Sequence, residues 1–173
     1  MDTYFTIEEK YLQAVDEVTY GELPKALQLL KEIIENDPFY ARAHFQLGKI
    51  YYYKIGDYQN AGYHFKTCME IEPSFPDVYF DYMALVVFLN MEKQVYLVAV
   101  KALTIPGVVV ADIYDYLGLF YEQNKNWNLA LAEYRKAHAE VTYKRLKDEI
   151  EESISRVKEK LQLAKAYQYH LTE

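Results

Sequence analysis

The sequence repeats with a period near 35 residues, and this period limits the possible folds more than any other feature. The segment YGELPKALQLLKEIIENDP (20–38) aligns with IGDYQNAGYHFKTCMEIEP (55–73) at an offset of 35 residues. HFQLGKIYY (44–52) aligns with YDYLGLFYE (114–122) at an offset of 70 residues, which is two periods. Repeats of this length are typical of arrays of helix pairs, in which each pair buries its apolar face only by stacking on its neighbours.

Small residues recur where the two helices of a pair would have to approach each other. In the second copy Gly48 and Ala61 occupy such positions, with Leu47, Tyr51 and Phe65 beside them to fill the remaining space. A glycine separates the two helices in the first two copies and a proline follows the second helix, as suits a turn and a helix end. Each copy is therefore predicted to be a pair of antiparallel helices.

This spacing resembles the tetratricopeptide repeat (TPR), whose signature is aromatic-x2-L-G-x2-Y, then A-x3-F, then P. Within residues 1–140 it gives four copies, at about 5–38, 41–75, 76–107 and 111–140. The second copy has one extra residue before its turn glycine, and the third copy is degenerate. The small positions of the third copy fit either Met83 or Ala84 and either Val95 or Tyr96. The resemblance implies an all-α, right-handed α-solenoid of about four helix-turn-helix units.

After the repeats, residues 141–173 are expected to form one long amphipathic helix. Its apolar stripe follows helical spacing and contains Leu146, Ile150, Ile154, Val157, Leu161 and Ala164. One interpretation is a helix that caps the last repeat; the other is a helix that joins two copies or binds a partner. On its polar face, Glu152 and Arg156 are spaced for an ion pair. At the other end of the chain, Thr6 and Glu9 are spaced as a capping box for the first helix.

The composition excludes several classes of ligand. The net charge is −7, and an acidic surface repels phosphate, so we expect neither nucleic acid nor an anionic membrane as a ligand. The single cysteine, Cys68, excludes an internal disulfide and favours a reducing compartment. The first residues do not resemble a targeting signal and no apolar run is long enough to span a bilayer, so a cytoplasmic location is expected.

The resemblance also implies a binding surface, because TPR proteins hold peptides on the concave face lined by the first helix of each pair. The residues proposed to form this peptide-binding groove are Arg42, Lys49, Tyr52, Tyr53, Asp81, Asp115 and Tyr116. Glu122 is expected to face the groove as well. Tyrosine suits such a surface because it combines a wide apolar ring, a polar tip and few rotatable bonds. The alternative is that tyrosines fill helix interfaces, which we expect for Tyr51, Tyr58, Tyr121 and Tyr134.

We therefore expect a non-enzymatic protein-interaction module, an adaptor, scaffold or assembly factor that binds a peptide or helix. Acidic residues at one end of the groove favour a partner with apolar anchors and basic residues, and argue against capture of a C-terminal carboxylate. Two alternatives remain: a peptide-holding chaperone similar to TPR-type secretion chaperones, and a structural homodimer joined through the C-terminal helix. The long apolar run in the third copy fits either a repeat buried on both sides or an exposed adhesive patch.

Residues suited to catalysis or metal binding form no recognisable pattern. The histidines at 44, 64, 138 and 170 belong to no H-x3-H or E-x-x-H pair. His44 and His64 are expected to pack between helices, and Cys68 to be a buried apolar residue. The sequence contains no phosphate loop, dinucleotide fingerprint or nucleophile elbow. We therefore expect no catalytic residues, no cofactor and no metal.

Overall fold

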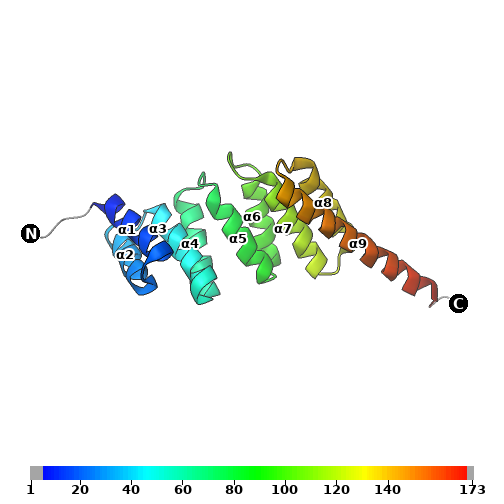
Figure 1. Cartoon of the computed structure of the whole chain (residues 1–173), viewed down its shortest axis with the longest axis horizontal. Helices are drawn as coiled ribbons and strands as arrows, with labels where there is room; N and C mark the ends of the chain where they lie inside the picture. Colours follow the sequence, from blue (N-terminus) through cyan, green and yellow to red (C-terminus); the bar gives the residue numbers. More distant parts are fainter. Residues whose placement is uncertain (1–5, 171–173) are drawn as a thin grey trace, which may run out of the picture. The chain divides into compact units, whose positions relative to one another are not determined.

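The computed structural model describes the backbone of residues 6–170 and the side chains of residues 6–164, and this part of the chain contains nine α-helices and no strand. Residues 1–5 and 171–173, the extreme ends of the predicted first repeat and last helix, lie outside the described residues, as does the side chain of His170. The helices are α1 (Ile7–Tyr20), α2 (Leu23–Asn36), α3 (Ala41–Ile50), α4 (Tyr58–Ile71), α5 (Asp77–Phe88), α6 (Glu92–Ala102), α7 (Val110–Gln123), α8 (Trp127–Glu140) and α9 (Lys144–His170) (Figure 1).

Contacts between the helices divide the chain into two compact units, residues 1–85 and 86–173. The first unit contains the hairpins α1–α2 and α3–α4 and most of α5. The second contains α6, the hairpin α7–α8, and α9, which packs against α8. Each unit is described separately below.

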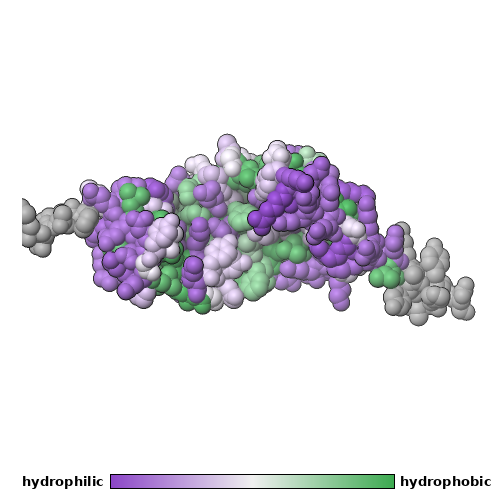
Figure 2. Space-filling model, in the orientation of Figure 1, coloured by the Kyte–Doolittle hydropathy of each residue, from purple (hydrophilic) through white to green (hydrophobic). Residues whose placement is uncertain are grey.

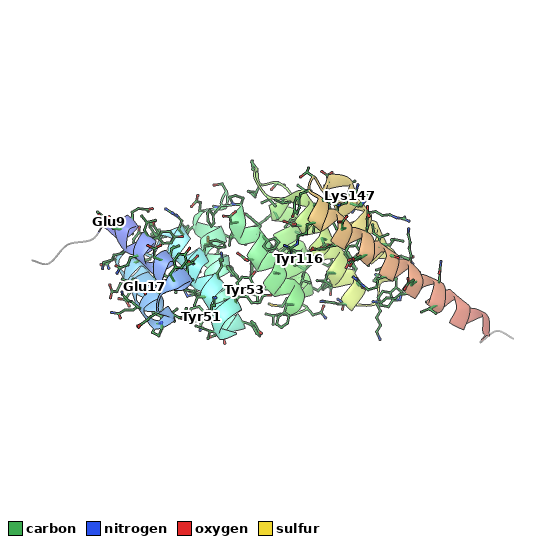
Figure 3. All side chains as sticks on the ribbon, viewed as in Figure 1. Glu9, Glu17, Tyr51, Tyr53, Tyr116 and Lys147 are labelled. Carbon is green, nitrogen blue, oxygen red and sulfur yellow. The ribbon has the colours of Figure 1, made fainter. Side chains whose placement is uncertain are left out.

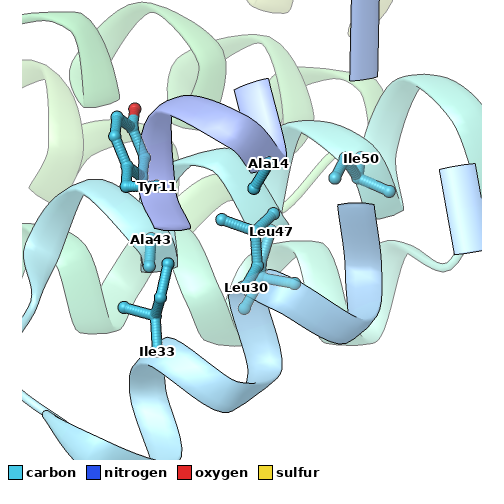
Figure 4. Close-up of a cluster of buried hydrophobic side chains, with 7 residues drawn as sticks. All are labelled: Tyr11, Ala14, Leu30, Ile33, Ala43, Leu47 and Ile50. Carbon is cyan, nitrogen blue, oxygen red and sulfur yellow. The ribbon is translucent and has the colours of Figure 1, made fainter. Parts of the chain in front are cut away.

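The core of the first unit lies where α1, α2 and α3 meet. Ala14 of α1, Leu30 and Ile33 of α2, and Leu47 of α3 are fully buried there (Figure 4). The small Ala14 side chain lets the neighbouring helix come close, and the larger side chains fill the space that remains. At the start of α1 the predicted capping box is confirmed: the Thr6 side chain accepts a hydrogen bond from the Glu9 backbone N–H.

The extra residue of the second copy is accommodated by a π-helical turn, η1 (Tyr51–Ile55), that continues α3. The N–H of Gly56 donates to the carbonyl of Tyr51, five residues back, at 2.9 Å. Gly56 then ends the helix at φ 78°, a left-handed conformation that favours glycine. Single π-helical turns are frequent at functional sites. Here the turn begins at Tyr51, the first of three consecutive tyrosines.

Two glycines make the hairpins α3–α4 and α7–α8 possible. A Cβ atom added to Gly48 would lie 2.5 Å from Cδ1 of Phe65, and one added to Gly118 would lie 2.5 Å from Cδ1 of Tyr134. Both rings are almost completely buried, so they have no room to move aside. The predicted role of these small positions is therefore confirmed, and in each hairpin an aromatic ring lies directly over the glycine of the facing helix.

Burial distinguishes the inward-facing side chains of the third copy. Val95 is fully buried whereas Tyr96 is 38% exposed, so Val95 takes the inward small position of α6. Met83 precedes Val95 by twelve residues, the same spacing as Gly118 and Ala130 in the fourth copy. The long apolar run is divided between the two faces of α6: Val98 is buried, but Val100 is 68% exposed.

Helix α9 covers the hairpin α7–α8. Leu146, Ile150 and Val157 of its stripe are buried in one cluster with Ala130 and Tyr134, and Ile154 and Leu161 pack against the same cluster. In Figure 2 the part of α9 that lies over α8 presents mainly hydrophilic side chains, coloured purple. The stripe of α9 therefore serves as the cap of the last hairpin, as the first interpretation of the sequence predicted.

Replacing either close-approach glycine should destabilise the protein. We expect Gly48→Ala and Gly118→Ala each to cost about 1–3 kcal/mol of unfolding free energy, because the new methyl group overlaps a buried ring. Urea unfolding followed by circular dichroism measures this cost. The matched control is Gly62→Ala on α4, where the nearest atom to the added Cβ lies at 3.7 Å. This change should be neutral or stabilising, since alanine favours a helix over glycine by roughly 0.5–1 kcal/mol. Equal effects at all three positions would contradict the packing account.

The capping role of α9 predicts a contrast between two of its apolar residues. Val157→Ser should cost roughly 1–3 kcal/mol, because Val157 is fully buried and the change leaves a cavity and a buried hydroxyl. Leu163→Ser should change the unfolding free energy by less than about 0.5 kcal/mol, because Leu163 is 60% exposed. Light scattering on the same variants reports the oligomeric state. A Val157→Ser protein that stays folded but loses a dimer would instead support a joining helix.

Candidate functional site

A pocket of about 530 Å³ lies in the first unit on the face formed by α1, α3 and η1. Val15 and Val18 of α1 and Ile50 of α3 supply its apolar wall, and Tyr53 of η1 borders it. This is the face formed by the first helix of each hairpin, where the sequence predicted a groove. The structure thus brings two of the predicted residues, Lys49 and Tyr53, together in one pocket, which its remaining lining residues complete: Thr19, Gln46 and Lys54.

The lining of this pocket is basic. Lys49 and Lys54 both border it, and within the described side chains neither ammonium group forms an ion pair. The Lys49 ammonium group instead lies 5.3 Å from the ring centre of Phe45. No carboxylate among the described residues lines the pocket. An apolar wall beside two ammonium groups favours a ligand with an apolar side chain next to a negative charge.

Tyr53 is tied to the last helix of the first unit. Its hydroxyl group donates to Oδ1 of Asp81 on α5 at 2.6 Å. Asp81 is only 7% exposed, and burial raises the pKa of its carboxyl group despite the Tyr53 hydrogen bond and nearby Lys49, which both lower it. Asp81 was expected to face the groove; it does not line the pocket, and its hydrogen bond orients the ring of Tyr53 (labelled in Figure 3).

Tyr52 does not line this pocket and packs against other tyrosines. Its ring centre lies 4.5 Å from that of Tyr53 and 6.0 Å from that of Tyr58 at the start of α4. Tyr58 was expected to fill a helix interface, but it is 37% exposed. Tyr51, Tyr121 and Tyr134 do pack in the cores of their units, as predicted.

Arg42 lies at the beginning of α3, and its guanidinium group contacts two residues of α1. Its Nη1 donates to Oε1 of Glu8 at 2.8 Å, and its guanidinium carbon lies 4.4 Å from the ring centre of Tyr11. The pKa of Glu8 is lowered, first by the hydrogen bond from Tyr40 and then by Arg42. Arg42 therefore joins α1 to α3 and does not line the pocket.

The acidic residues predicted on α7 face α9 as well as solvent. Arg156 of α9 donates twice to Glu122 of α7, from Nε at 2.7 Å and from Nη2 at 2.8 Å, and Lys160 donates at 2.8 Å. Glu122 is 7% exposed, and these bonds, with that from Tyr134, lower the pKa of its carboxyl group to about 2. The expectation that Glu122 faces an open groove is therefore wrong. The expected Glu152–Arg156 pair is also replaced, because the Arg156 guanidinium binds Glu122.

Asp115 and Tyr116 lie on the same helix, and both are partly buried. Burial and the neighbouring carboxylates of Asp112, Glu149 and Glu122 raise the pKa of Asp115 to about 6, against the lowering effect of Arg156. Asp112 accepts a hydrogen bond from the Tyr143 hydroxyl at 3.3 Å. Tyr116 (Figure 3) belongs to the second unit and Tyr53 to the first.

His44 and His64 form a buried pair between α3 and α4, as predicted. The two Nδ1 atoms are 3.0 Å apart, and Nε2 of His44 lies 3.1 Å from the carbonyl oxygen of Pro38. Because a carbonyl only accepts, Nε2 of His44 carries the proton, so its Nδ1 accepts from Nδ1 of His64. Tyr51 stacks on His64 with an interplanar angle of 3°. Among the described residues no three His, Cys, Asp or Glu side chains are grouped to hold a metal ion.

This histidine pair predicts a loss of stability in acid. Burial lowers the pKa of both histidines, that of His64 to about 4 with help from His44 and Lys31, so both are neutral when folded. The unfolded chain takes up protons at its ordinary pKa, near 6.5, so stability is present above this pH and is lost as the pH falls toward 4. Because solvent partly screens the pair, we expect a loss of roughly 1–2 kcal/mol over this range. His64→Gln should flatten the pH dependence measured by urea unfolding; an unchanged slope would contradict it.

Cys68 is fully buried, as expected, and burial raises the pKa of its thiol to about 12. No helix in the described part of the chain is long and apolar enough to cross a membrane.

Comparison with solved structures identifies the fold. A crystal structure of MamA protein matches 95% of this chain and 87% of its own, with a TM-score of 0.76 and 20% identity. MamA from Desulfovibrio magneticus RS-1 matches with a TM-score of 0.74 at 18% identity, over 96% of this chain and 91% of its own. A thermophilic TPR protein of Thermus thermophilus matches with a TM-score of 0.64 at 18% identity, over 86% of this chain and 81% of its own. The chain therefore has a TPR-like, all-α fold.

At these identities the likeness shows the fold alone. No protein-family model matches the chain, and no curated protein matches its sequence.

Sequence reasoning did not find the apolar wall of the pocket in the first unit. Val15 and Val18 lie on α1, in a copy whose aromatic and Leu-Gly signature positions are weak, so the groove prediction used the second and later copies. The i, i+3 spacing of the two valines was the available signal, because it places both on one helix face.

Proposed function

We propose that this protein binds a segment of another polypeptide on the α1–α3–η1 face of its first unit. The observation that carries the proposal is the pocket itself, an apolar wall of Val15, Val18 and Ile50 beside Lys49 and Lys54. An apolar side chain of the partner would enter the pocket, and a neighbouring Asp or Glu would meet the lysines. Because exposed charges contribute modestly, the apolar anchor supplies most of the affinity and the lysines supply selectivity.

Tyr53 gives the pocket a fixed edge. The hydrogen bond to Asp81 holds the ring of Tyr53 before a partner arrives, so little rotamer entropy is lost on binding. Tyr53 is 53% exposed, which leaves ring surface available to a partner. Tyr52, Asp115 and Tyr116 remain proposed contacts outside this pocket, whereas Arg42 acts in our account by joining α1 to α3.

The sequence favoured a partner with apolar anchors and basic residues. We keep the apolar anchor for this pocket, but its two lysines select an acidic neighbour for that anchor. A basic group of the partner is accommodated at a different place, described in the next subsection.

Of the two alternatives, a homodimer through α9 has the weaker support, because the stripe proposed to join two copies covers α7 and α8. A holding chaperone draws support from the exposed apolar side chains of α6, Leu97 at 52% and Val100 at 68%. Binding of many unrelated unfolded clients with similar affinity would favour the chaperone.

A random peptide library displayed on phage and selected on the immobilised protein tests the proposed function. We expect enrichment of a large apolar residue next to Asp or Glu. A selected peptide should bind Val18→Ser and the double variant Lys49→Gln, Lys54→Gln about fivefold or more weakly, roughly 1 kcal/mol, because each change removes one part of the recognition.

The matched control for the charge change is Lys144→Gln, Lys158→Gln, which removes two exposed lysines of α9 and should leave the affinity unchanged. Enrichment of basic peptides, or an equal loss in the control, would refute binding at the α1–α3–η1 face.

A further inference from the structure

A second pocket, of about 270 Å³, lies in the second unit at the ends of three helices. It is formed by the turn before α6, the start of α6, the last turn of α7 and the start of α8. Its volume is below the usual range for a small-molecule site, roughly 300–1,000 Å³, and suits one side chain. The groove predicted from the sequence does not include these residues: Asn90, Glu92, Tyr96, Phe120, Tyr121 and Asn124.

Three aromatic rings form one side of this pocket. The ring centre of Tyr96 lies 6.0 Å from that of Phe120 and 6.3 Å from that of Tyr121, and the last two are 5.6 Å apart. Phe120 is 4% exposed, so it holds the other two rings in place, and Tyr96 is 38% exposed at the edge. The faces of such rings carry negative charge density and attract cations.

Three asparagines, Asn90, Asn124 and Asn126, line the polar side of the pocket and supply acceptor oxygens. The side-chain amide of Asn124 donates to Oδ1 of Asn90 at 2.8 Å and to the carbonyl of Phe120 at 2.8 Å, so both its N–H groups are used. Asn90 in turn donates to Oδ1 of Asn124 at 3.3 Å. The amide oxygens keep further lone pairs. Asn90 adopts φ 52°, a left-handed conformation that asparagine takes up more often than most residues other than glycine.

The charge around the pocket is negative. Glu92 lines it, and within the described side chains the Glu92 carboxylate forms no hydrogen bond or ion pair. Glu133 of α8 lies close enough to raise the pKa of Tyr121, after the larger effects of burial and the Tyr96 hydrogen bond. Only one oxygen of Glu133, Oε1, is paired, with Lys136, while the buried Oε2 has no partner among the described residues. Lys93 and Lys125 are neighbours in sequence but do not line the pocket.

We propose that this pocket binds the guanidinium group of an arginine side chain from a partner polypeptide. A guanidinium is a flat cation with five N–H donors and no acceptor, and it stacks on aromatic rings. It therefore matches the rings of Tyr96 and Tyr121, the carboxylate of Glu92 and the amide oxygens of Asn90 and Asn124 at once. The site does not depend on the pocket of the first unit, since the two share no residue.

The test uses the full chain labelled with ¹⁵N and the peptide acetyl-Gly-Arg-Gly-amide as the probe. We expect saturable chemical-shift changes at the backbone amides of Asn90, Glu92 and Asn124, with a dissociation constant on the order of 1 mM for a single side chain. The same peptide with citrulline, which has a similar shape and no charge, should bind at least about fivefold more weakly. The lysine peptide should also bind more weakly, because an ammonium group is more strongly hydrated and does not stack.

Two variants and a control locate the site. Glu92→Gln removes the charge with little change of shape and should weaken arginine binding about threefold or more. Tyr96→Leu should weaken it similarly by removing a cation–π contact. Glu152→Gln, an exposed glutamate on α9, should leave it unchanged. Equal binding of the citrulline or lysine peptide, shifts confined to other residues, or equal losses in Glu92→Gln and the control would each overturn the proposal.

Discussion

The hairpins α3–α4 and α7–α8 depend on a close contact between a glycine of one helix and an aromatic ring of the other. At Gly48 and at Gly118 the ring of the facing helix takes the place that a Cβ atom would occupy. The two helices can then approach closely enough to bury Phe65 and Tyr134 almost completely. Tyr53 and Lys49 follow Gly48 on the same stretch of helix, so the direction in which they point depends on this approach. The same holds for Tyr121 and Glu122 after Gly118.

In the last hairpin, the carboxylate of Glu122 is bound by side chains of α9. A repeat in the middle of an array is covered by the next one, but α7 and α8 are covered by α9. The apolar stripe of α9 supplies the area, and Arg156 and Lys160 neutralise Glu122, which would be costly to bury unpaired. Consequently, one of the carboxylates predicted to face this end of the groove, that of Glu122, is neutralised within the chain. By contrast, Lys49 and Lys54 of the first unit and Glu92 of the second form no ion pair among the described residues.

Much of the fold could be predicted because its signals are local. The period of 35 residues, the glycines and the Thr6–Glu9 spacing each act within one hairpin, so the sequence alone indicates where helices begin, turn and approach. The direction of individual side chains was harder to predict. Gln46, Ile50 and Tyr53 follow the i, i+4, i+7 spacing of one helix face, so Tyr53 lines the pocket, whereas Tyr52 lies one position off this face. Glu122 was predicted to face the groove because the repeat pattern does not include α9, whose Arg156 and Lys160 bind it. The pocket lined by Glu92 was not predicted, because it depends on the left-handed turn at Asn90.

The central claim is that the first helices of the hairpins in the first unit recognise a polypeptide. Hydrogen–deuterium exchange of the full chain, with and without a peptide selected from the library, tests it most directly. The account predicts slower exchange on binding in residues 15–19 and 46–54, with no comparable change in α2, whose hairpin partner α1 carries the binding face. Protection confined to α2 or to the outer face of α6 would contradict the claim and place recognition on another side of the helices.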